Sequence, residues 1–348
     1  LIIAPGIANF VLGWGEAARR YSKNHEQMIV LTGAAGFIGS ATVAALNAAG
    51  YRALALVDDF SRKDEHANFA GKRFWELVDR NQFFNWLTHK QDRIECIIHL
   101  GARTDTTETD TALFDRLNLD YSKRVFEYAT RWQIPLIYAS SAATYGGGEH
   151  GFDDDHARVS QLQPLNAYGQ SKQDFDTWVL AQTEQPFFWA GLKFFNVYGP
   201  NEYHKGRMAS VVFHAFNQIQ RTGELKLFQS HHPDYADGEQ ARDFIYVKDV
   251  TSAILHLMER RPHPGIFNLG SGKARTFKAL GEAVFAALQQ PTKIEFIPTP
   301  QDIRANYQYF TQANMKKLNL AGWEGPHYSL EDGVNDYVNN YLLSGNNL

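Results

Sequence analysis

Cysteine is almost absent from this sequence: Cys96 is the only one among 348 residues, and it lies in the apolar run at 94–98. A single cysteine cannot form an intramolecular disulfide, and it argues against a cysteine-based metal site. The thirteen histidines also lack the paired spacing of a zinc-binding helix. We therefore expect a buried structural thiol, no metal and a reducing compartment.

The sequence also lacks an excess of charge of one sign and a long apolar run. Its net charge of −4 gives no general attraction to nucleic acid or acidic membranes. The apolar stretch at residues 1–15 is too short to span a bilayer and lacks the basic start of a secretory signal. We interpret residues 1–27 as an extension upstream of the natural start. We expect a cytoplasmic protein that binds neither nucleic acid nor membrane.

From Met28 onward, short apolar β-rich runs alternate with amphipathic stretches. This alternation implies parallel strands joined by crossover helices, so we predict an α/β fold, a Rossmann-type doubly wound parallel sheet with a smaller C-terminal α/β substrate lobe. Expected strands of the sheet are 28–31, 53–57, 96–100, 136–140 and 188–193, with a helix at 36–49. Residues 267–269 and 294–297 are expected as short strands of the smaller lobe, with a helix at 277–289 between them.

These elements suggest a division of the chain into two domains. We place a mainly dinucleotide-binding domain at 28–195. A mainly substrate-binding lobe follows at 196–348, with some of its segments returning to the first domain.

A glycine-rich loop follows the first expected strand and opens the first expected helix. Gly33, Gly36 and Gly39 let the backbone turn tightly, approach a pyrophosphate and present helix N-terminal amides to it. Asp58 ends the second expected strand, where an acidic side chain can bond the adenosine ribose. Arg62, Lys63 and Arg80 lie close enough in sequence to neutralise a 2′-phosphate, so the residues alone leave the choice between NAD and NADP open.

Two further segments are expected near this cofactor. Residues 99–104 follow a strand and carry the small side chains that let a backbone pass close to a cofactor. Asn118, in a helical stretch, can hydrogen-bond the backbone near the active site, or else satisfy local backbone only.

Tyr168 and Lys172 are four residues apart and share one face of a predicted helix, so the ammonium is expected to sit beside the phenol and favour its ionised form. A phenolate near neutral pH is a base for a sugar hydroxyl. Ser141 ends a preceding strand, and its hydroxyl can orient the substrate oxygen. No Gly-x-Ser-x-Gly elbow surrounds it, which disfavours a serine nucleophile. Together with the nucleotide loop, these residues indicate redox chemistry on an alcohol.

The same residues resemble the extended short-chain dehydrogenase/reductases, and within them the ADP-L-glycero-D-manno-heptose 6-epimerase family. The resemblance covers Met28 to about Tyr341 and includes the lysine after Tyr-Gly-Pro, which generic sugar-nucleotide epimerases lack. It is carried by the segments 138–147 (YASSAATYGG), 195–200 (FNVYGP), 204–206 (HKG), 208–211 (MASV), 242–247 (RDFIYV) and 310–313 (FTQA).

The resemblance implies a function and a set of site residues. It implies a homo-oligomer that interconverts the C6 epimers of an ADP-linked heptose for lipopolysaccharide core synthesis. Tyr168 and Lys205 would be the two acid/base groups, with Lys172 lowering the phenol's pKa and Ser141 orienting the sugar. The expected dinucleotide contacts are Gly33, Gly36, Phe37, Ile38, Gly39, Asp58, Asp59, Arg80, Leu100, Gly101, Ala102, Arg103, Thr104, Asn118, Lys172 and Val197. The expected substrate contacts are Ser141, Asn196, Arg207, His214, Phe228, Arg242 and Tyr307.

The chain departs from the family pattern near the cofactor and the substrate. Asp59 stands where asparagine is common, Arg80 where lysine is common, and Arg207 where a serine contacts substrate. The family commonly prefers NADP, and we predict NADP with NAD also accepted, because a bidentate guanidinium on a phosphate should outweigh more distant carboxylates.

Other functions remain as alternatives. A UDP-hexose 4-epimerase has the same fold and would be separated by assaying ADP- against UDP-sugars. A dehydratase would need an acid beside Ser141, where this chain has two alanines. A non-catalytic NADP-binding regulator would be expected to lose the Tyr168/Lys172 pair.

Overall fold

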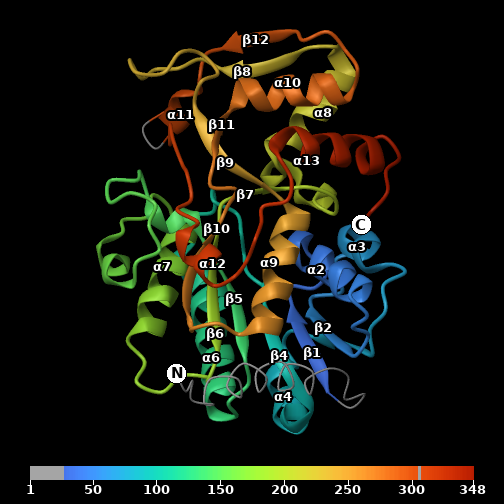
Figure 1. Cartoon of the computed structure of the whole chain (residues 1–348), viewed down its shortest axis with the longest axis vertical. Coiled ribbons are helices and arrows are strands. Elements are labelled where there is room, and N and C mark those ends of the chain that lie inside the picture. The colour runs from blue at the N-terminus through green and yellow to red at the C-terminus, as the bar shows by residue number, and fades with distance from the viewer. Residues whose placement is uncertain (1–26, 305–306) are drawn as a thin grey trace, which may run out of the picture.

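The computed structural model describes residues 27–304 and 307–348 and is built around a seven-stranded parallel sheet (Figure 1). The strand order is β10-β6-β5-β4-β1-β2-β3, so the chain starts near the middle and winds outward in both directions. The strands are β1 (Met28–Thr32), β2 (Leu54–Asp58), β3 (Glu76–Asp79), β4 (Ile94–His99), β5 (Leu136–Ser141), β6 (Trp189–Phe194) and β10 (Gly265–Leu269). This is the predicted doubly wound sheet, and the fold class is confirmed.

Helices cover both faces of the sheet. One face packs against α2 (Phe37–Ala48), α9 (Val247–Arg260) and α12 (Lys316–Leu320) through Val43, Ile254 and Leu318, all without exposed surface. The other packs against α4 (Phe83–Lys90), α6 (Tyr121–Arg131) and α7 (Ala167–Leu180) through residues such as Phe126 and Val179. Apart from the edge strand β3, the strands are buried on both faces, which explains their largely apolar sequences. Short helices α3 (His66–Phe69), α5 (Thr111–Phe114) and α11 (Gln301–Arg304) lie in the connections.

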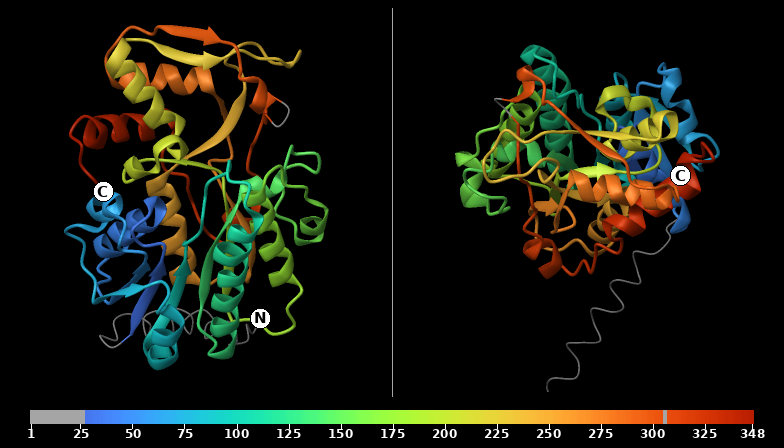
Figure 2. Two further views of the ribbon diagram at one scale, coloured as in Figure 1. Left: turned by 180° about the vertical axis from the view of Figure 1, so that it is seen from behind. Right: turned by 90° about the horizontal axis from the view of Figure 1, so that it is seen from above.

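A smaller lobe sits beyond the carboxyl ends of the strands (Figures 1 and 2). It contains a three-stranded sheet of order β11-β9-β7 and a parallel pair, β12 with β8. These strands are β7 (Asn196–Tyr198), β8 (Leu225–Phe228), β9 (Ala241–Tyr246), β11 (Ala274–Thr276) and β12 (Ile294–Ile297). Its core forms between β8, β9 and the helices α8 (Val211–Thr222), α10 (Phe277–Ala287) and α13 (Leu330–Tyr337).

One strand was predicted in the wrong place. Residues 267–269, expected in the smaller lobe, belong to β10 at the edge of the main sheet, parallel to β6. Its apolar residues are fully buried, because α12 and its flanking residues cover them. The expected strand at 294–297 does lie in the smaller lobe. The domain boundary at 195 stays a prediction.

The interpretation of residues 1–27 as an extension falls almost entirely outside the described residues. Within the part of the chain that the structure describes, no helix is both long and apolar enough to cross a membrane. The same residues contain no group of His, Cys, Asp and Glu side chains arranged to hold a metal ion. Cys96 is buried, as expected.

Candidate active site

The site forms where the winding of the sheet reverses, between β1 and its neighbour β4. The chain leaves these strands at Gly33 and Gly101, which meet at the carboxyl edge. Thr32 joins them: its hydroxyl oxygen accepts from the Gly101 amide at 3.2 Å and pairs with His99 Nδ1 at 2.6 Å. Such a switch point is where open α/β sheets bind ligands.

Two glycines allow the nucleotide loop to pack this closely. Gly33 has a φ of +69°, and a Cβ there would lie 2.6 Å from the Gly101 nitrogen. A Cβ on Gly39 would lie 1.9 Å from the Gly33 carbonyl oxygen. Glycine at 33 allows the turn, and glycine at 39 lets the start of α2 pack against the loop. The amides at the start of α2 therefore face the cleft with no side-chain cap.

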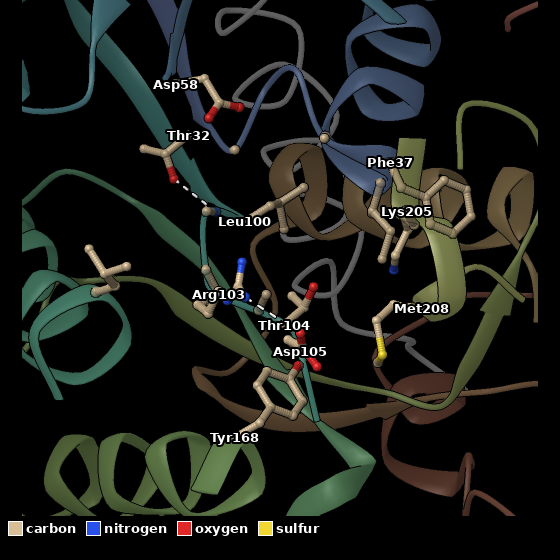
Figure 3. Close-up of a pocket in the computed structure, with 18 of the residues that line it drawn as sticks. Thr32, Phe37, Asp58, Leu100, Arg103, Thr104, Asp105, Tyr168, Lys205 and Met208 are labelled. Atoms are coloured by element: carbon tan, nitrogen blue, oxygen red, sulfur yellow. Dashed lines mark hydrogen bonds and ion pairs between the residues drawn. The ribbon is translucent and has the colours of Figure 1, made fainter. Parts of the chain in front are cut away.

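A cleft of about 660 Å³ opens at this edge (Figure 3). It is lined by nearly all residues predicted to contact a dinucleotide, and by all four predicted catalytic residues. The lining includes Gly33, Gly36, Phe37, Ile38, Gly39, Asp58, Asp59, Arg80, Leu100, Gly101, Ala102, Arg103, Thr104, Val197, Ser141, Tyr168, Lys172 and Lys205. The structure thus brings together residues from eight separate segments, although their contacts with a ligand stay predictions.

The acidic end of β2 is held by the loop that it faces. Asp58 accepts hydrogen bonds from the amides of Ala35 and Asp59, both at 2.8 Å. Burial raises the pKa of Asp58, while these amides oppose that shift. Arg80 lies 3.3 Å from Asp59 in an ion pair, and Arg62 pairs with Glu65 at 2.7 Å. The two guanidinium groups nearest to this end of the cleft therefore already have carboxylate partners.

Asn118 does not line the cleft but holds one of its walls. Its amide exchanges two hydrogen bonds with the backbone of Arg103, at 2.8 and 3.0 Å, and donates to Ser171 Oγ at 3.0 Å. The predicted bonding to backbone near the active site is present. Asn118 is 1% exposed and its amide bonds to the Arg103 backbone. Its direct contact with a cofactor stays a prediction.

Ser141 and the first turns of α7 form one wall of the cleft. Asn166 starts this helix by accepting from the Gly169 amide at 2.8 Å, which fixes Tyr168 in the first turn. Ser141 ends β5, and its Oγ accepts from the Ala143 amide at 3.1 Å. Lys172 is 5% exposed and donates to the Ala139 carbonyl at 2.7 Å.

Burial sets the electrostatics of the phenol and of the neighbouring amine. Burial raises the pKa of Tyr168, and a hydrogen bond with Ser141 only partly opposes this shift. Burial lowers the pKa of Lys172 to about 8, against the attraction of Asp176. That the Lys172 ammonium lowers the phenol's pKa during the reaction stays a prediction.

Lys205 enters the cleft from another element, the 3-10 turn η6 (Tyr203–Met208). Figure 3 shows it beside Phe37, across the cleft from Tyr168, and its Nζ lies 5.5 Å from the centre of the Phe37 ring. Burial lowers the pKa of Lys205, and Glu202 opposes that shift. Glu202 is fully buried and holds the turn by accepting from the amides of Gly199 and Ser210. The predicted lysine is thus poised at the site in a partly desolvated position.

Most predicted substrate residues lie elsewhere. Within the described residues, only Ser141 of this set lines the cleft. Arg242 on β9 is 8% exposed and lies 5.6 Å from the rings of both Tyr307 and Phe277, while its guanidinium donates to the carbonyls of Ala241 and Gln308. Burial lowers the pKa of Arg242 to about 10.

The other predicted substrate residues are dispersed over the smaller lobe and its edges. Arg207 is exposed and reaches Asp105 and Thr107. His214 lines a separate groove on α8, and its Nε2 contacts the Arg207 carbonyl at 3.3 Å. Asn196 begins β7 and is exposed, and Phe228 ends β8 half-buried. The structure does not bring these residues together around one cavity, so their contacts stay predictions.

Several lining residues were missed by sequence reasoning. Glu65 and His204 face each other at 3.6 Å in the cleft wall, next to Lys205. Burial raises the pKa of Glu65 to about 7 and lowers that of His204 to about 4. His204 directly precedes Lys205 and was quoted only as part of a motif, whereas nothing in the sequence around Glu65 signals its burial. The remaining missed lining residues include Thr32, Val57, Asp105, Leu113, Leu117, Tyr121, Ala139, Phe194, Phe195 and Met208.

The residues present fit a nicotinamide dinucleotide. The uncapped amides of α2 can receive a pyrophosphate, the cleft runs from there past Asp58 in one direction, and it reaches Ser141 and Tyr168 in the other. Gly33, Phe37, Asp58 and Lys172 would hold the group at its pyrophosphate and ribose positions.

Comparisons with known proteins agree with this geometry. The family model for the NAD dependent epimerase/dehydratase family matches residues 29–270. ADP-L-glycero-D-manno-heptose-6-epimerase of Fusobacterium nucleatum subsp. nucleatum is 45% identical over 325 residues, which cover 90% of this chain and 98% of that protein. The enzyme of the same name from Nitratidesulfovibrio vulgaris is 45% identical over 319 residues, which cover 91% and 98%.

A solved structure extends the likeness to three dimensions. The crystal structure of Helicobacter pylori ADP-L-glycero-D-manno-heptose-6-epimerase aligns with a TM-score of 0.74 at 27% identity, over 92% of this chain and 97% of that one. Sequence, fold and cleft therefore agree, and the chain belongs to the NAD dependent epimerase/dehydratase family and, within it, to the ADP-L-glycero-D-manno-heptose-6-epimerases.

Proposed function

We propose that this protein interconverts ADP-D-glycero-β-D-manno-heptose and ADP-L-glycero-β-D-manno-heptose at C6, for lipopolysaccharide inner-core synthesis. The observation that carries the proposal is the convergence of Ser141, Tyr168, Lys172 and Lys205 on a single cleft that begins at the nucleotide loop. Relatives 45% identical over nearly their whole length carry the name of this activity.

The chemistry divides between two walls of the cleft. When bound, the dinucleotide supplies a reversible hydride acceptor. Ser141 orients the C6 hydroxyl, and Tyr168 takes its proton as the carbon is oxidised to a carbonyl. Once the sugar has turned, Lys205 or Tyr168 would return a proton to the carbonyl oxygen as the carbon is reduced on its other face. Lys172, one turn after Tyr168 on α7, would favour the ionised phenol and bind the ribose of the dinucleotide.

Each of these steps has a requirement that the geometry supports. Two proton donors on separate elements, α7 and η6, allow protonation from two sides. A buried lysine has a lowered pKa, which is the direction a proton-exchanging amine needs near neutral pH. No net redox change occurs, so the bound dinucleotide is recycled rather than consumed.

The test is direct conversion of the sugar nucleotide. Purified protein without added cofactor is incubated with ADP-D-glycero-β-D-manno-heptose, and the two epimers are resolved by anion-exchange chromatography. We expect both epimers at equilibrium, whichever one is supplied. UDP-glucose and UDP-galactose serve as comparison substrates: conversion of these alone would indicate the 4-epimerase alternative, and no conversion of any sugar nucleotide would indicate the non-catalytic regulator.

We propose NADP as the preferred cofactor, with NAD also accepted. Arg80 is the best-placed guanidinium for a 2′-phosphate: its side chain is 43% exposed and its partner Asp59 lies at 3.3 Å, so the pair can open toward a phosphate. Arg62 is already engaged with Asp64 and Glu65. Mass spectrometry of the dinucleotide released from native protein tests this choice, and finding only NAD would overturn it.

We further propose that the enzyme acts on ADP-heptose in the cytoplasm as a homo-oligomer, and that it binds neither nucleic acid nor membrane. Sedimentation velocity of the purified protein tests the assembly, and a single monomeric species at micromolar concentration would contradict it.

A further inference from the structure

The strand that carries Ser141 has a second polar face, turned away from the cleft. Side chains of β5 alternate, so Ala139 and Ser141 line the cleft while Tyr138 and Ser140 point to its far side. Both hydroxyls donate to Asp176 of α7, from Tyr138 at 3.1 Å and from Ser140 at 2.6 Å. A carboxylate therefore lies directly behind the strand end that forms the site.

Asp176 has an ionic partner in an equally buried position. Lys193 on β6, the strand next to β5, places its Nζ 2.8 Å from an Asp176 oxygen, and neither side chain has any exposed surface. Removing two charges from water is costly, and well-packed apolar residues of similar size often stabilise a fold as well or better. Stability alone is a weak reason for an ion pair in this place.

A chain of hydrogen bonds connects the pair to Ser141. Lys193 donates to Thr144 Oγ1 at 2.6 Å, and the Thr144 hydroxyl donates to the Ser141 carbonyl at 2.8 Å. The Ser141 Oγ in turn accepts from the Ala143 amide at 3.1 Å. The backbone and the side chain of Ser141 are thus both held within the turn that Lys193 anchors.

The pair also acts on Lys172, which lies one helical turn before Asp176 on α7. The Asp176 charge raises the pKa of Lys172 against the lowering effect of burial. The other titratable groups around this amine are Tyr168 on the same helix and His99 on β4. Burial lowers the pKa of His99 to about 3, so it is neutral and cannot replace the carboxylate.

We propose that Asp176 and Lys193 are positioning residues for the epimerase reaction, acting through Thr144 to hold the turn that fixes the Ser141 hydroxyl. The proposal rests on the proposed function. Neither residue touches the cleft, so neither is a catalytic residue.

The first experiment compares turnover with stability in three variants. Lys193→Met and Asp176→Asn each leave a buried group unpaired, and we expect a melting temperature lower by about 5–10 °C. We expect kcat at 25 °C to fall at least about tenfold with KM within about threefold, because a small displacement of a positioned group is costly in rate. Lys248→Met is the matched control: it breaks the Lys248–Asp336 ion pair, 2.5 Å long and outside the cleft lining, so it should lower the melting temperature alone.

Thr144→Val tests the connection without disturbing the pair. It removes the bridging hydroxyl and leaves the Asp176–Lys193 contact in place. We expect kcat to fall about tenfold with little change in melting temperature. Thr144→Val also tests the positioning role if Lys193→Met and Asp176→Asn fail to fold. Unchanged kcat in Thr144→Val would overturn that role.

A double variant separates positioning from stability. Asp176→Leu with Lys193→Met replaces both charges by apolar side chains and should recover part of the melting temperature, because no charge is left unpaired while the Tyr138 and Ser140 hydroxyls lose their acceptor. We expect kcat to remain low, because the Thr144 anchor and the charge beside Lys172 are both gone. Recovery of kcat together with stability would show that the pair is only structural.

A final measurement does not depend on turnover. NMR titration of lysine side chains labelled with ¹⁵N, with Lys172 assigned by Lys172→Met, reports the charge of that amine directly. Asp176 raises the Lys172 pKa, so Asp176→Asn should lower it, while Lys248→Met should leave it unchanged. If wild-type protein fails to convert ADP-heptose, the proposed function fails while this titration still decides the effect of Asp176. If conversion is normal and the titration does not shift, the Asp176 charge does not act on Lys172.

Discussion

The sheet half of the molecule and the smaller lobe hold their predicted site residues in different ways. In the sheet half, side chains from β1, β2, β4, β5 and α7 meet in one cleft although they are far apart in the chain. In the smaller lobe, Arg242 packs among Tyr307 and Phe277, while His214 faces a separate groove. The predicted site residues of the sheet half line one cleft, whereas the predicted substrate residues of the smaller lobe lie at separate places.

The reason lies in the topology of the two halves. All strands of a parallel sheet end at the same edge, so a residue that follows a strand is brought to the site by the fold itself. The smaller lobe mixes parallel and antiparallel strands from distant parts of the chain, and no single edge collects its side chains. We therefore expect the sheet half to supply the reacting groups and the smaller lobe to supply contacts with the substrate. The predictions below test this division, from the largest expected effect to the smallest.

Tyr168→Phe tests the sheet half most severely. We expect kcat to fall at least about a hundredfold, the usual share of acid/base catalysis, with melting temperature and dinucleotide binding nearly unchanged. Tyr121→Phe is the matched control, because Tyr121 also lines the cleft but donates to the Arg80 carbonyl at 3.2 Å. It should retain turnover within about threefold. Turnover near that of the wild type in Tyr168→Phe would remove the phenol from the mechanism.

Lys205→Met tests η6, which lies between β7 and α8 and reaches the cleft. If the amine moves a proton, kcat falls by about two orders of magnitude or more while ADP-heptose still binds within about tenfold. Binding is measured by calorimetry on the inactive variant. The opposite pattern, much weaker binding with normal turnover at saturation, would mean that Lys205 holds phosphate and moves no proton.

The sequence was sufficient for the first half because its signals are local. The glycines at 33 and 39, the acid at 58 and the Tyr168/Lys172 spacing each follow or open a predicted element, and parallel topology then joins them. The sequence could not predict how far burial removes these groups from water. Burial raises the pKa of Tyr168, and no local sequence pattern reports how deeply a side chain is buried.

The remaining features could not be predicted because they depend on tertiary contacts. The strand at 265–269 was assigned to the wrong lobe because a short apolar run does not say which sheet it joins. Glu65 and His204 meet in the cleft wall from separate loops, and no periodic pattern marks either one. The substrate residues inferred from family resemblance carry their identity in the sequence, but their gathering around a ligand depends on tertiary contacts.

Arg242→Met tests whether the smaller lobe contributes ligand binding. A buried guanidinium that bonds a diphosphate is worth about 10–100-fold in affinity, so KM for ADP-heptose and Kd for ADP should rise by that factor, with kcat at saturation within about threefold. Arg275→Met is the control, because Arg275 lies opposite Arg242 on β11 but pairs with Glu331. A lower melting temperature with unchanged KM and ADP affinity would make Arg242 a structural residue only.

Arg207→Ala should have the smallest effect. It distinguishes an exposed arginine that adds only surface charge from one that binds the substrate directly. The side chain is 68% exposed and its ion pair with Asp105 is 3.5 Å long, so solvent and salt screen it. We expect KM for ADP-heptose to change by about threefold or less, kcat to change by about twofold or less, and the difference from wild type to shrink at 0.5 M salt. Lys226→Ala, which breaks the exposed pair with Glu295 at 3.0 Å, provides the matched control and should leave KM unchanged. A rise in KM above about tenfold that persists in salt would mean that Arg207 leaves Asp105 to bind the substrate directly, and that the smaller lobe assembles its part of the site only around the ligand.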